Sequence, residues 1–283
     1  WNLLSFAMQM LLVLVTGYML ASTSLISMLL TKLATLANTA PKAIILVTFI
    51  SLLASWLNWG FGLVIGALFA KAIANQTRVD YRLLVASAYS GFVVWHGGLA
   101  GSVPLTIATE GHFSQATMGI IGTQQTLFAG FNIAILIGLF IIMPLVNRYM
   151  LPSEKDSVYV DPSLLENTPP DKVTITRPAQ HLEQSKLLGM GIGLIGLAYL
   201  GYYFFIAGGG LNLNSVIALF LFMAITLHQT PHNVLNSLQQ AIPSGAGIVI
   251  QFPFYAGIMA VMVDTGLAQQ ISQGFIAIAD ADS

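Results

Sequence analysis

The chain has 283 residues, of which 56% are hydrophobic and 7% are charged, whereas about 25% of residues are charged in soluble domains. Its mean hydropathy is +0.79 and its formal net charge is −1. These values predict a membrane protein and exclude a polybasic nucleic-acid-binding protein, while the absence of cysteine excludes disulfides, iron–sulfur clusters and thiol catalysis.

The first predicted elements are a transmembrane span over Leu3–Ala21 and a surface helix within Ser22–Ala40. The span lacks the basic leader and the small-residue cleavage site of a signal peptide. In the second segment, apolar and polar residues recur at near-helical spacing, which favours a helix lying along the membrane surface.

A re-entrant hairpin is predicted over residues 41–74. The uncharged stretch 43–70 is interrupted by Asn58-Trp59-Gly60-Phe61-Gly62. As helices, the arms Ala43–Leu57 and Leu63–Ala74 would be about 22 and 18 Å long, against roughly 30 Å of hydrocarbon. We therefore expect the chain to enter the membrane, turn at the glycines and leave on the same face. Such hairpins are tolerated where they are packed in protein or line a cavity, as in transporter substrate sites.

The next span, 83–108, is predicted to be broken. Three glycines and a proline fall between Gly97 and Pro104, and this composition does not sustain an ordinary helix. We expect two half-helices around an unwound centre. An outer loop, Glu110–Gln125, and a third span, 126–146, complete the first half.

The only long hydrophilic segment is 148–186, which contains eleven of the charged residues and five prolines. This composition predicts an extended cytoplasmic linker between two membrane halves. The second half, 187–283, carries spans over Leu187–Ala207, Ser215–Leu227 and Ile242–Val263, with a polar surface segment before the last of them.

The distribution of Lys and Arg gives the orientation. If the hairpin is re-entrant, every Lys and Arg falls on one side of the membrane, which the positive-inside rule assigns to the cytoplasm. If the hairpin were one straight span, the cations would be split across the bilayer.

A weak internal repeat relates the two halves. An offset of 242 residues pairs Gln9 with Gln251 and Thr23 with Thr265, and in both places an apolar span gives way to a short polar turn and a second helix. We therefore expect an inverted-repeat fold in which 1–147 is the first membrane repeat and 187–283 begins a second, incomplete one.

The hairpin tip is the first candidate binding site. Asn58, Gly60, Phe61 and Gly62 surround the start of the second arm, where backbone N–H groups and the positive helix end stabilise an anion without a cationic side chain. That arrangement suits a substrate carboxylate inside a membrane. The alternative is that Gly60 and Gly62 simply allow close helix packing.

The broken span is the second candidate site. Its backbone and hydroxyl groups could bind a carboxylate or a coupling cation through Ser90, Gly97, Gly98, Gly101 and Ser102. The alternative is a proline-kinked helix that serves packing alone.

Two further residues are candidates. His96 is the titratable side chain nearest mid-membrane in the first half, so it is a proton-coupling candidate, although a structural histidine explains it equally well. Gln251 is a candidate for the entry to a second half-site. Catalytic motifs, clustered carboxylates and nucleotide-binding loops are absent from the sequence, so we expect neither an enzyme nor a metal site.

The chain resembles the bacterial short-chain fatty acid transporter family. The segments that carry the likeness are 1–10, 58–67, 101–105, 127–133 and 251–258, which read WNLLSFAMQM, NWGFGLVIGA, GSVPL, LFAGFNI and QFPFYAGI. The resemblance implies secondary transport of short-chain monocarboxylates such as acetoacetate and butyrate across the bacterial inner membrane. We expect no cofactor, and the sequence leaves open whether the coupling ion is H⁺ or Na⁺. It also implies kinship with a larger ion-transporter group that uses two re-entrant hairpins and an elevator-like motion, and by analogy a homodimer.

The sequence departs from the family pattern in two ways. Members of that family often have glycine where this chain has His96, which weakens the proton-coupling role. They also continue with a second hairpin, so we expect this chain to be a fragment. Two alternatives stay open: a dicarboxylate or amino-acid permease of the same superfamily, and a non-transporting membrane sensor whose linker, 148–186, docks a partner protein.

Overall fold

The computed structural model describes residues 3–112, 114–165 and 177–276. Within these residues the secondary structure is helical and no strand is present. In these described ranges, six helical stretches are long and apolar enough to cross a membrane by length and composition: Leu4–Ala21, Ala40–Leu57, Tyr81–Ile107, Gly130–Tyr149, Lys186–Phe205 and Pro231–Asp264. The predicted all-α polytopic membrane protein is therefore confirmed.

The elements follow one another along the chain as a series of α-helices with short 3₁₀ segments between them. They are α1 (Leu4–Ala21), α2 (Ser24–Ala34), α3 (Ala40–Leu57), α4 (Trp59–Ala74), α5 (Tyr81–Ser90), η1 (Gly91–Gly97), α6 (Ser102–Ile107), α7 (Gln115–Met118), η2 (Thr123–Gln125), α8 (Gly130–Tyr149), η3 (Pro162–Leu165), α9 (Pro178–Glu183), α10 (Lys186–Phe205), α11 (Leu213–His228), α12 (Pro231–Ala241), η4 (Ile242–Gly245), α13 (Ala246–Asp264) and α14 (Leu267–Ile276).

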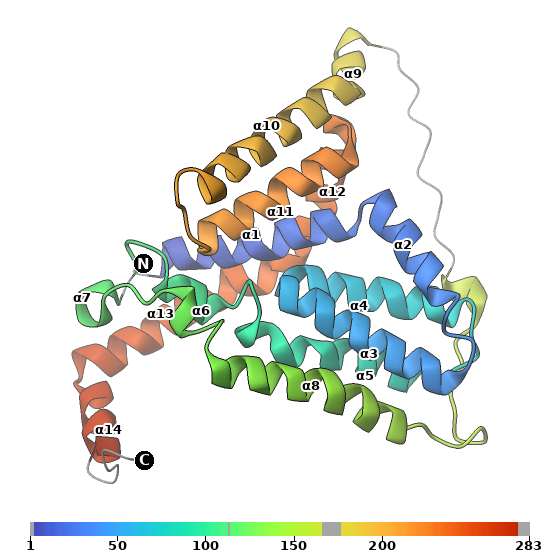
Figure 1. Cartoon of the computed structure of the whole chain (residues 1–283), viewed down its shortest axis with the longest axis horizontal. Helices are drawn as coiled ribbons and strands as arrows, with labels where there is room; N and C mark the ends of the chain where they lie inside the picture. The colour runs from blue at the N-terminus through green and yellow to red at the C-terminus, as the bar shows by residue number, and fades with distance from the viewer. Residues whose placement is uncertain (1–2, 113, 166–176, 277–283) are drawn as a thin grey trace.

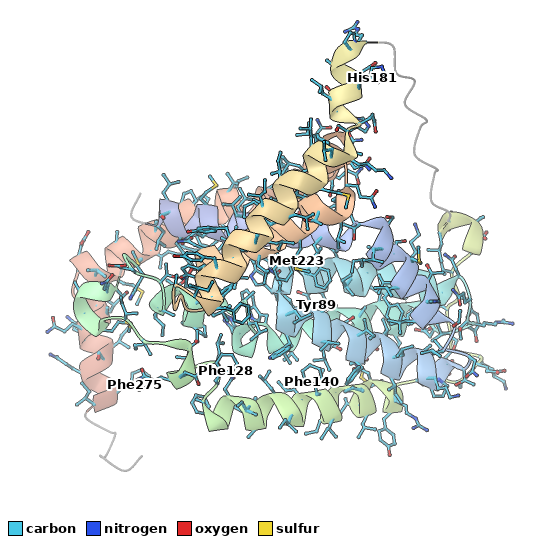
Figure 2. The ribbon with its side chains drawn as sticks, turned by 45° about the horizontal axis from the view of Figure 1, so that its top comes forward. Tyr89, Phe128, Phe140, His181, Met223 and Phe275 are labelled. Carbon is cyan, nitrogen blue, oxygen red and sulfur yellow. The ribbon has the colours of Figure 1, made fainter. Side chains whose placement is uncertain are left out.

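Two groups of helices lie on either side of α1 (Figure 1). One group contains α3, α4, α5 and α8, and the other contains α10, α11 and α12. Large apolar side chains are exposed on the outer faces of both groups, as expected where a protein meets lipid. Tyr89 of α5, labelled in Figure 2, is 66% exposed. Phe275 of α14, outside both groups and also labelled there, is exposed to the same extent.

α13 packs antiparallel against the first half of α1. The rings of Phe6 and Phe252 lie 5.5 Å apart, and Gly245 at the start of α13 approaches Leu11 further along α1. After a short turn, α1 is followed by α2, which has 11 residues, and α13 is followed by α14, which has 10 residues. This arrangement agrees with the offset of 242 residues, and the division into two inverted repeats stays a prediction.

The predicted hairpin is formed by α3 and α4, which pack closely side by side and are joined by Asn58 alone. Because the connection has only one residue, the last turn of α3 and the first turn of α4 are held in close contact. A Cβ atom at Gly62 would lie 2.4 Å from Ser55 Cα and 2.5 Å from Ser55 N, so this position requires glycine. A straight span through this region is therefore excluded.

The first arm is longer than predicted, because α3 covers Ala40–Leu57 and not only Ala43–Leu57. Thr39 and Pro41 start α3 earlier than the apolar run suggests, because proline is well tolerated in the first turn of a helix. The resulting 18-residue helix is long enough to cross a membrane. An antiparallel hairpin nevertheless leaves Lys42 and Lys71 at one end, whatever its depth, and the assignment of that end to the cytoplasm stays a prediction.

The tip of the hairpin packs against the second half of α1. A Cβ atom at Gly17 would lie 2.5 Å from Phe61 N, and one at Gly60 would lie 2.7 Å from Leu14 Cα. Two glycines, one on each partner, therefore let the two backbones meet directly. Beyond the tip, the Phe61 ring packs edge-on against Phe220 of α11, with ring centroids 5.9 Å apart.

The first part of the predicted linker is docked on the protein. The linker begins after α8, and its residues 166–176 lie outside the described residues. Val158 N donates to Asp80 Oδ2 at 2.7 Å, and Tyr81 N donates to Val158 O at 2.8 Å. Arg82 Nη2 donates to Asp156 O at 2.7 Å and also pairs with Asp80 at 3.1 Å. Asp80 therefore holds the linker against the start of α5.

Replacing Asp80 by asparagine is expected to lower stability by about 2 kcal/mol at pH 7, because hydrogen bonds to a charged acceptor contribute most. Burial raises the pKa of Asp80, but hydrogen bonds from Val158, Leu83 and Arg82 outweigh this and lower it below its ordinary value. A lowered folded-state pKa gives stability that is present above the unfolded pKa of about 3.9 and is lost as the pH falls through the folded pKa. Melting temperatures at pH 7 and below pH 4 check this.

The difference between D80N and the wild type should therefore shrink in acid. Glu154→Gln, on an exposed carboxylate of the same linker segment, is the matched control and should leave the melting temperature unchanged. An equal stability loss at both pH values would contradict a role for the Asp80 charge.

Candidate functional site

Asn58 is the centre of the candidate site and is fully buried, with 0% exposure. Its backbone is extended, and its Oδ1 accepts a hydrogen bond from Phe61 N at 3.0 Å, which caps α4. Its Nδ2 is buried and has no hydrogen-bond partner within the part of the chain that the structure describes. The tip therefore combines the positive end of a 16-residue helix with an amide donor that lacks an acceptor.

The structure brings the broken span to the hairpin tip. The helix α5 tightens into η1, unwinds at residues 98–101 and resumes as α6. Leu99 N donates to Trp56 O at 2.7 Å, which satisfies a carbonyl at the end of α3. A Cβ atom at Gly98 would lie 2.5 Å from Trp56 O, so glycine permits this crossing.

The other glycines of the break also sit at close contacts. Asn132 Nδ2 donates to Gly97 O at 3.2 Å, and a Cβ atom at Gly101 would lie 2.4 Å from His96 O. Ser102 is buried at the start of α6, but this helix has only six residues. A helix this short carries little of the dipole that favours anions, so the tip of α4 is the better anion site.

Ser90 belongs to a different polar cluster. Its hydroxyl donates to Ser87 O at 2.8 Å and accepts from Asn147 Nδ2 at 2.7 Å, and Asn147 also donates to Thr48 at 3.0 Å. Thr48 precedes Asn58 by about 15 Å along α3. Asn147 was not predicted as a site residue, because the predicted third span ended at residue 146. A polar residue at the end of an apolar run could have indicated it.

His96 lies at the end of η1 with an exposed side chain. Its ring contacts the ring of Trp95, with centroids 3.9 Å apart. Among the described residues, no hydrogen-bond partner of this ring is found. Its proton-coupling role stays a prediction.

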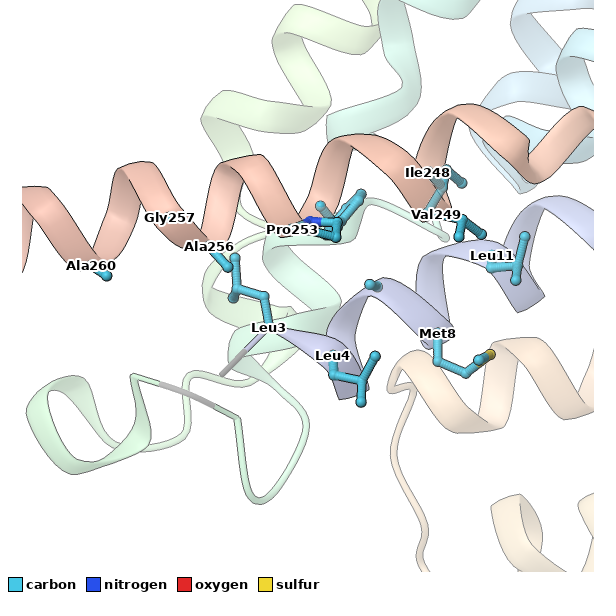
Figure 3. Close-up of a pocket in the computed structure, with 12 residues that line it drawn as sticks. Leu3, Leu4, Met8, Leu11, Ile248, Val249, Pro253, Ala256, Gly257 and Ala260 are labelled. Carbon is cyan, nitrogen blue, oxygen red and sulfur yellow. The ribbon is translucent and has the colours of Figure 1, made fainter. Parts of the chain in front are cut away.

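Gln251 does not join the tip. It is exposed on α13 and is not among the residues that line the apolar groove of about 550 Å³ between α13 and the start of α1 (Figure 3). The groove is lined by Leu3, Leu4, Ala7, Met8, Leu11, Ile248, Val249, Phe252, Pro253, Ala256, Gly257 and Ala260.

A second apolar groove, of about 460 Å³, borders the broken span. It lies between the end of α3, the unwound segment and α8, and Gly97 and Leu99 form part of its wall. Its surface is almost entirely apolar, which suits a short hydrocarbon tail. In the part of the chain that the structure describes, no group of three or more His, Asp or Glu side chains is placed to hold a metal ion.

Comparison with known proteins identifies a matching family and two similar proteins. A family model described as "Short chain fatty acid transporter" matches residues 1–283. A protein of Escherichia coli (strain K12) named "Putative short-chain fatty acid transporter" is 42% identical over 287 residues, which cover 100% of this chain and 65% of that protein. A protein of Haemophilus influenzae with the same name is 40% identical over 294 residues, covering 100% of this chain and 66% of that protein. The chain thus spans about two-thirds of these relatives. No solved structure matches it.

Proposed function

Because this chain belongs to the short chain fatty acid transporter family, we propose that it forms the substrate-binding part of a secondary transporter for short-chain monocarboxylates. The chain is a multi-pass protein of the bacterial inner membrane. The observation that carries the proposal is the buried Asn58 amide at the N-terminus of α4, for which residues 3–112, 114–165 and 177–276 provide no acceptor.

The proposed site binds the carboxylate with neutral donors. No Lys or Arg lies between Lys42 and Lys71, so the anion would be held by Asn58 Nδ2 and by backbone N–H groups at the start of α4. Hydrogen bonds to an ionised acceptor are strong where water is excluded. Phe61 and Leu99 supply apolar surface for a short acyl tail.

The site is closed in this state, because the Asn58 side chain has no exposure to solvent. Substrate entry would require the tip to separate from α1 or from the unwound segment. At Gly17 and Gly60 the backbones of α1 and α4 are in direct contact, so a small displacement of one helix relative to the other would expose the tip. Alternating access would then expose the tip to one side of the membrane at a time.

Uptake into proteoliposomes tests the proposal. The protein at its natural length should accumulate labelled butyrate or acetoacetate when an H⁺ or Na⁺ gradient is imposed. Transport of succinate without butyrate would favour a dicarboxylate permease. The absence of transport for every acid, together with capture of a soluble protein by 148–186, would favour a sensor instead.

We further propose that the hairpin is re-entrant, and cysteine labelling tests this directly because the chain has no native cysteine. A membrane-impermeant reagent should label K42C and R78C from the cytoplasmic face alone. L57C, next to the tip, should not be labelled from the opposite face. Labelling of positions 42 and 78 from opposite faces would contradict the hairpin topology, and labelling of position 57 from outside would show that the hairpin crosses.

A further inference from the structure

We infer that Trp59 is a second donor to the substrate carboxylate and that its indole N–H acts beside the Asn58 amide. This inference rests on the proposed function and names a residue that neither the sequence patterns nor the family description assigns. Trp59 is the first residue of α4, and its side chain is 7% exposed.

The indole nitrogen is the first reason. Trp59 Nε1 is buried and has no hydrogen-bond partner among the described residues. An indole N–H can only donate a hydrogen bond, so it cannot be satisfied by a neighbouring donor. More than nine in ten buried polar groups in proteins are paired. Among the described residues, five buried side-chain atoms lack a partner, in Ser51, Asn58, Trp59, Ser87 and Thr126. Asn58 Nδ2 and Trp59 Nε1 belong to consecutive residues at one helix N-terminus, and that placement is why we assign the acceptor to this position.

The surroundings of the ring are the second reason. Trp59 meets Trp95 edge-on at 5.7 Å between ring centroids and Phe92 at 6.4 Å, while Phe92 and Trp95 stack at 4.9 Å. These rings hold the indole in one orientation and keep water away from it. A donor that is already fixed in orientation and shielded from water loses little conformational entropy when the anion binds.

The donor set also indicates specificity. A carboxylate presents two oxygens with about four acceptor positions, enough for Asn58, Trp59 and a backbone N–H together. The side chains of Phe61 and Leu99, which face the acyl tail in the proposed site, carry no hydrogen-bond donor, so a second carboxylate at the far end of the substrate would be left unpaired there. The arrangement therefore favours monocarboxylates over dicarboxylates.

Trp59→Phe tests the inference, because it removes the N–H and keeps an aromatic ring. In proteoliposomes the KM for butyrate should rise about tenfold, as expected for the loss of one hydrogen bond to an ionised acceptor, with little change in maximal rate. The change in tryptophan fluorescence on adding butyrate to the purified protein should also be lost. Tyr203→Phe is the matched control and should change neither readout. It removes a hydroxyl near the end of α10, away from the tip, where Tyr203 Oη donates to Gly210 O at 3.4 Å and accepts from Asn212 Nδ2 at 3.1 Å.

Each outcome decides the point. If W59F melts at a lower temperature but keeps the wild-type KM and the fluorescence change, the indole N–H serves packing against the neighbouring rings and the inference is wrong. In that case uptake by the wild type still supports the proposed function. If the wild type neither binds nor transports any short-chain monocarboxylate, the proposed function fails and this inference fails with it.

Discussion

Replacing Gly62 by alanine is expected to separate the two arms of the hairpin and to destabilise the protein by about 3 kcal/mol, at the upper end for overpacked sites. The added Cβ would lie 2.4 Å from Ser55 Cα and 2.5 Å from Ser55 N. These are backbone atoms, so no side-chain rotation relieves the contact. Alanine gains up to about 1 kcal/mol over glycine inside a helix, which does not offset the clash. Thermal unfolding of the purified protein and butyrate uptake measure the effect.

Two further variants separate this cause from others. Gly138→Ala, in the middle of α8, has no heavy atom within 4 Å of the added Cβ and should leave stability unchanged or slightly raised. Ser55→Gly combined with Gly62→Ala should not restore stability, because the Ser55 backbone still blocks the new methyl group. Wild-type stability of G62A would show that the arms are not held at this distance.

The hairpin was predictable because its signals are local. The residues Asn58-Trp59-Gly60-Phe61-Gly62 contain a helix-capping residue and two small residues within an otherwise uncharged run, and such signals act over a few positions. The break in the next span was predictable for the same reason. Its 3₁₀ stretch, Gly91–Gly97, was not, because it arises where Gly91 packs against Ser51 and Leu52 of α3.

The contacts that sequence reasoning missed join residues far apart in the chain. Asn147 reaches Thr48 across 99 positions, and Val158 reaches Asp80 across 78. No local pattern specifies such a pairing, since each partner alone is an ordinary polar residue near a helix end. Trp59 was missed for another reason. An aromatic residue in an apolar helix is normally explained by packing, and only the structure reveals that no acceptor among the described residues pairs with its N–H.

The position of the site also explains why neutral donors would suffice. A Lys or Arg at the tip would have to be buried against α1, where an unpaired charge is expensive in the state without substrate. An amide at a helix N-terminus avoids that cost and still attracts an anion. The same reasoning predicts that an added negative charge at the tip is far more harmful than the loss of a donor.

Asn58→Asp is therefore expected to reduce butyrate uptake about 100-fold or more at neutral pH, because like charges placed together cost several kcal/mol. The introduced carboxyl keeps the oxygen that caps α4, so the hairpin should still form. It removes the Nδ2 donor and repels the substrate carboxylate. Protonation of the introduced carboxyl would remove the charge and restore an O–H donor, so uptake should recover in part as the pH falls.

Asn212→Asp is the matched control for this variant. Asn212 caps α11 in the same way, with its Oδ1 accepting from Ser215 N at 3.0 Å, and it lies in the α10–α11 turn. The same substitution there should leave uptake and its pH dependence unchanged. Full activity of N58D at neutral pH would mean that the carboxylate does not bind at the tip, whereas equal loss in N212D would trace the effect to general damage. The pH-dependent recovery is the sharper test, because a misfolded hairpin would not regain transport on acidification.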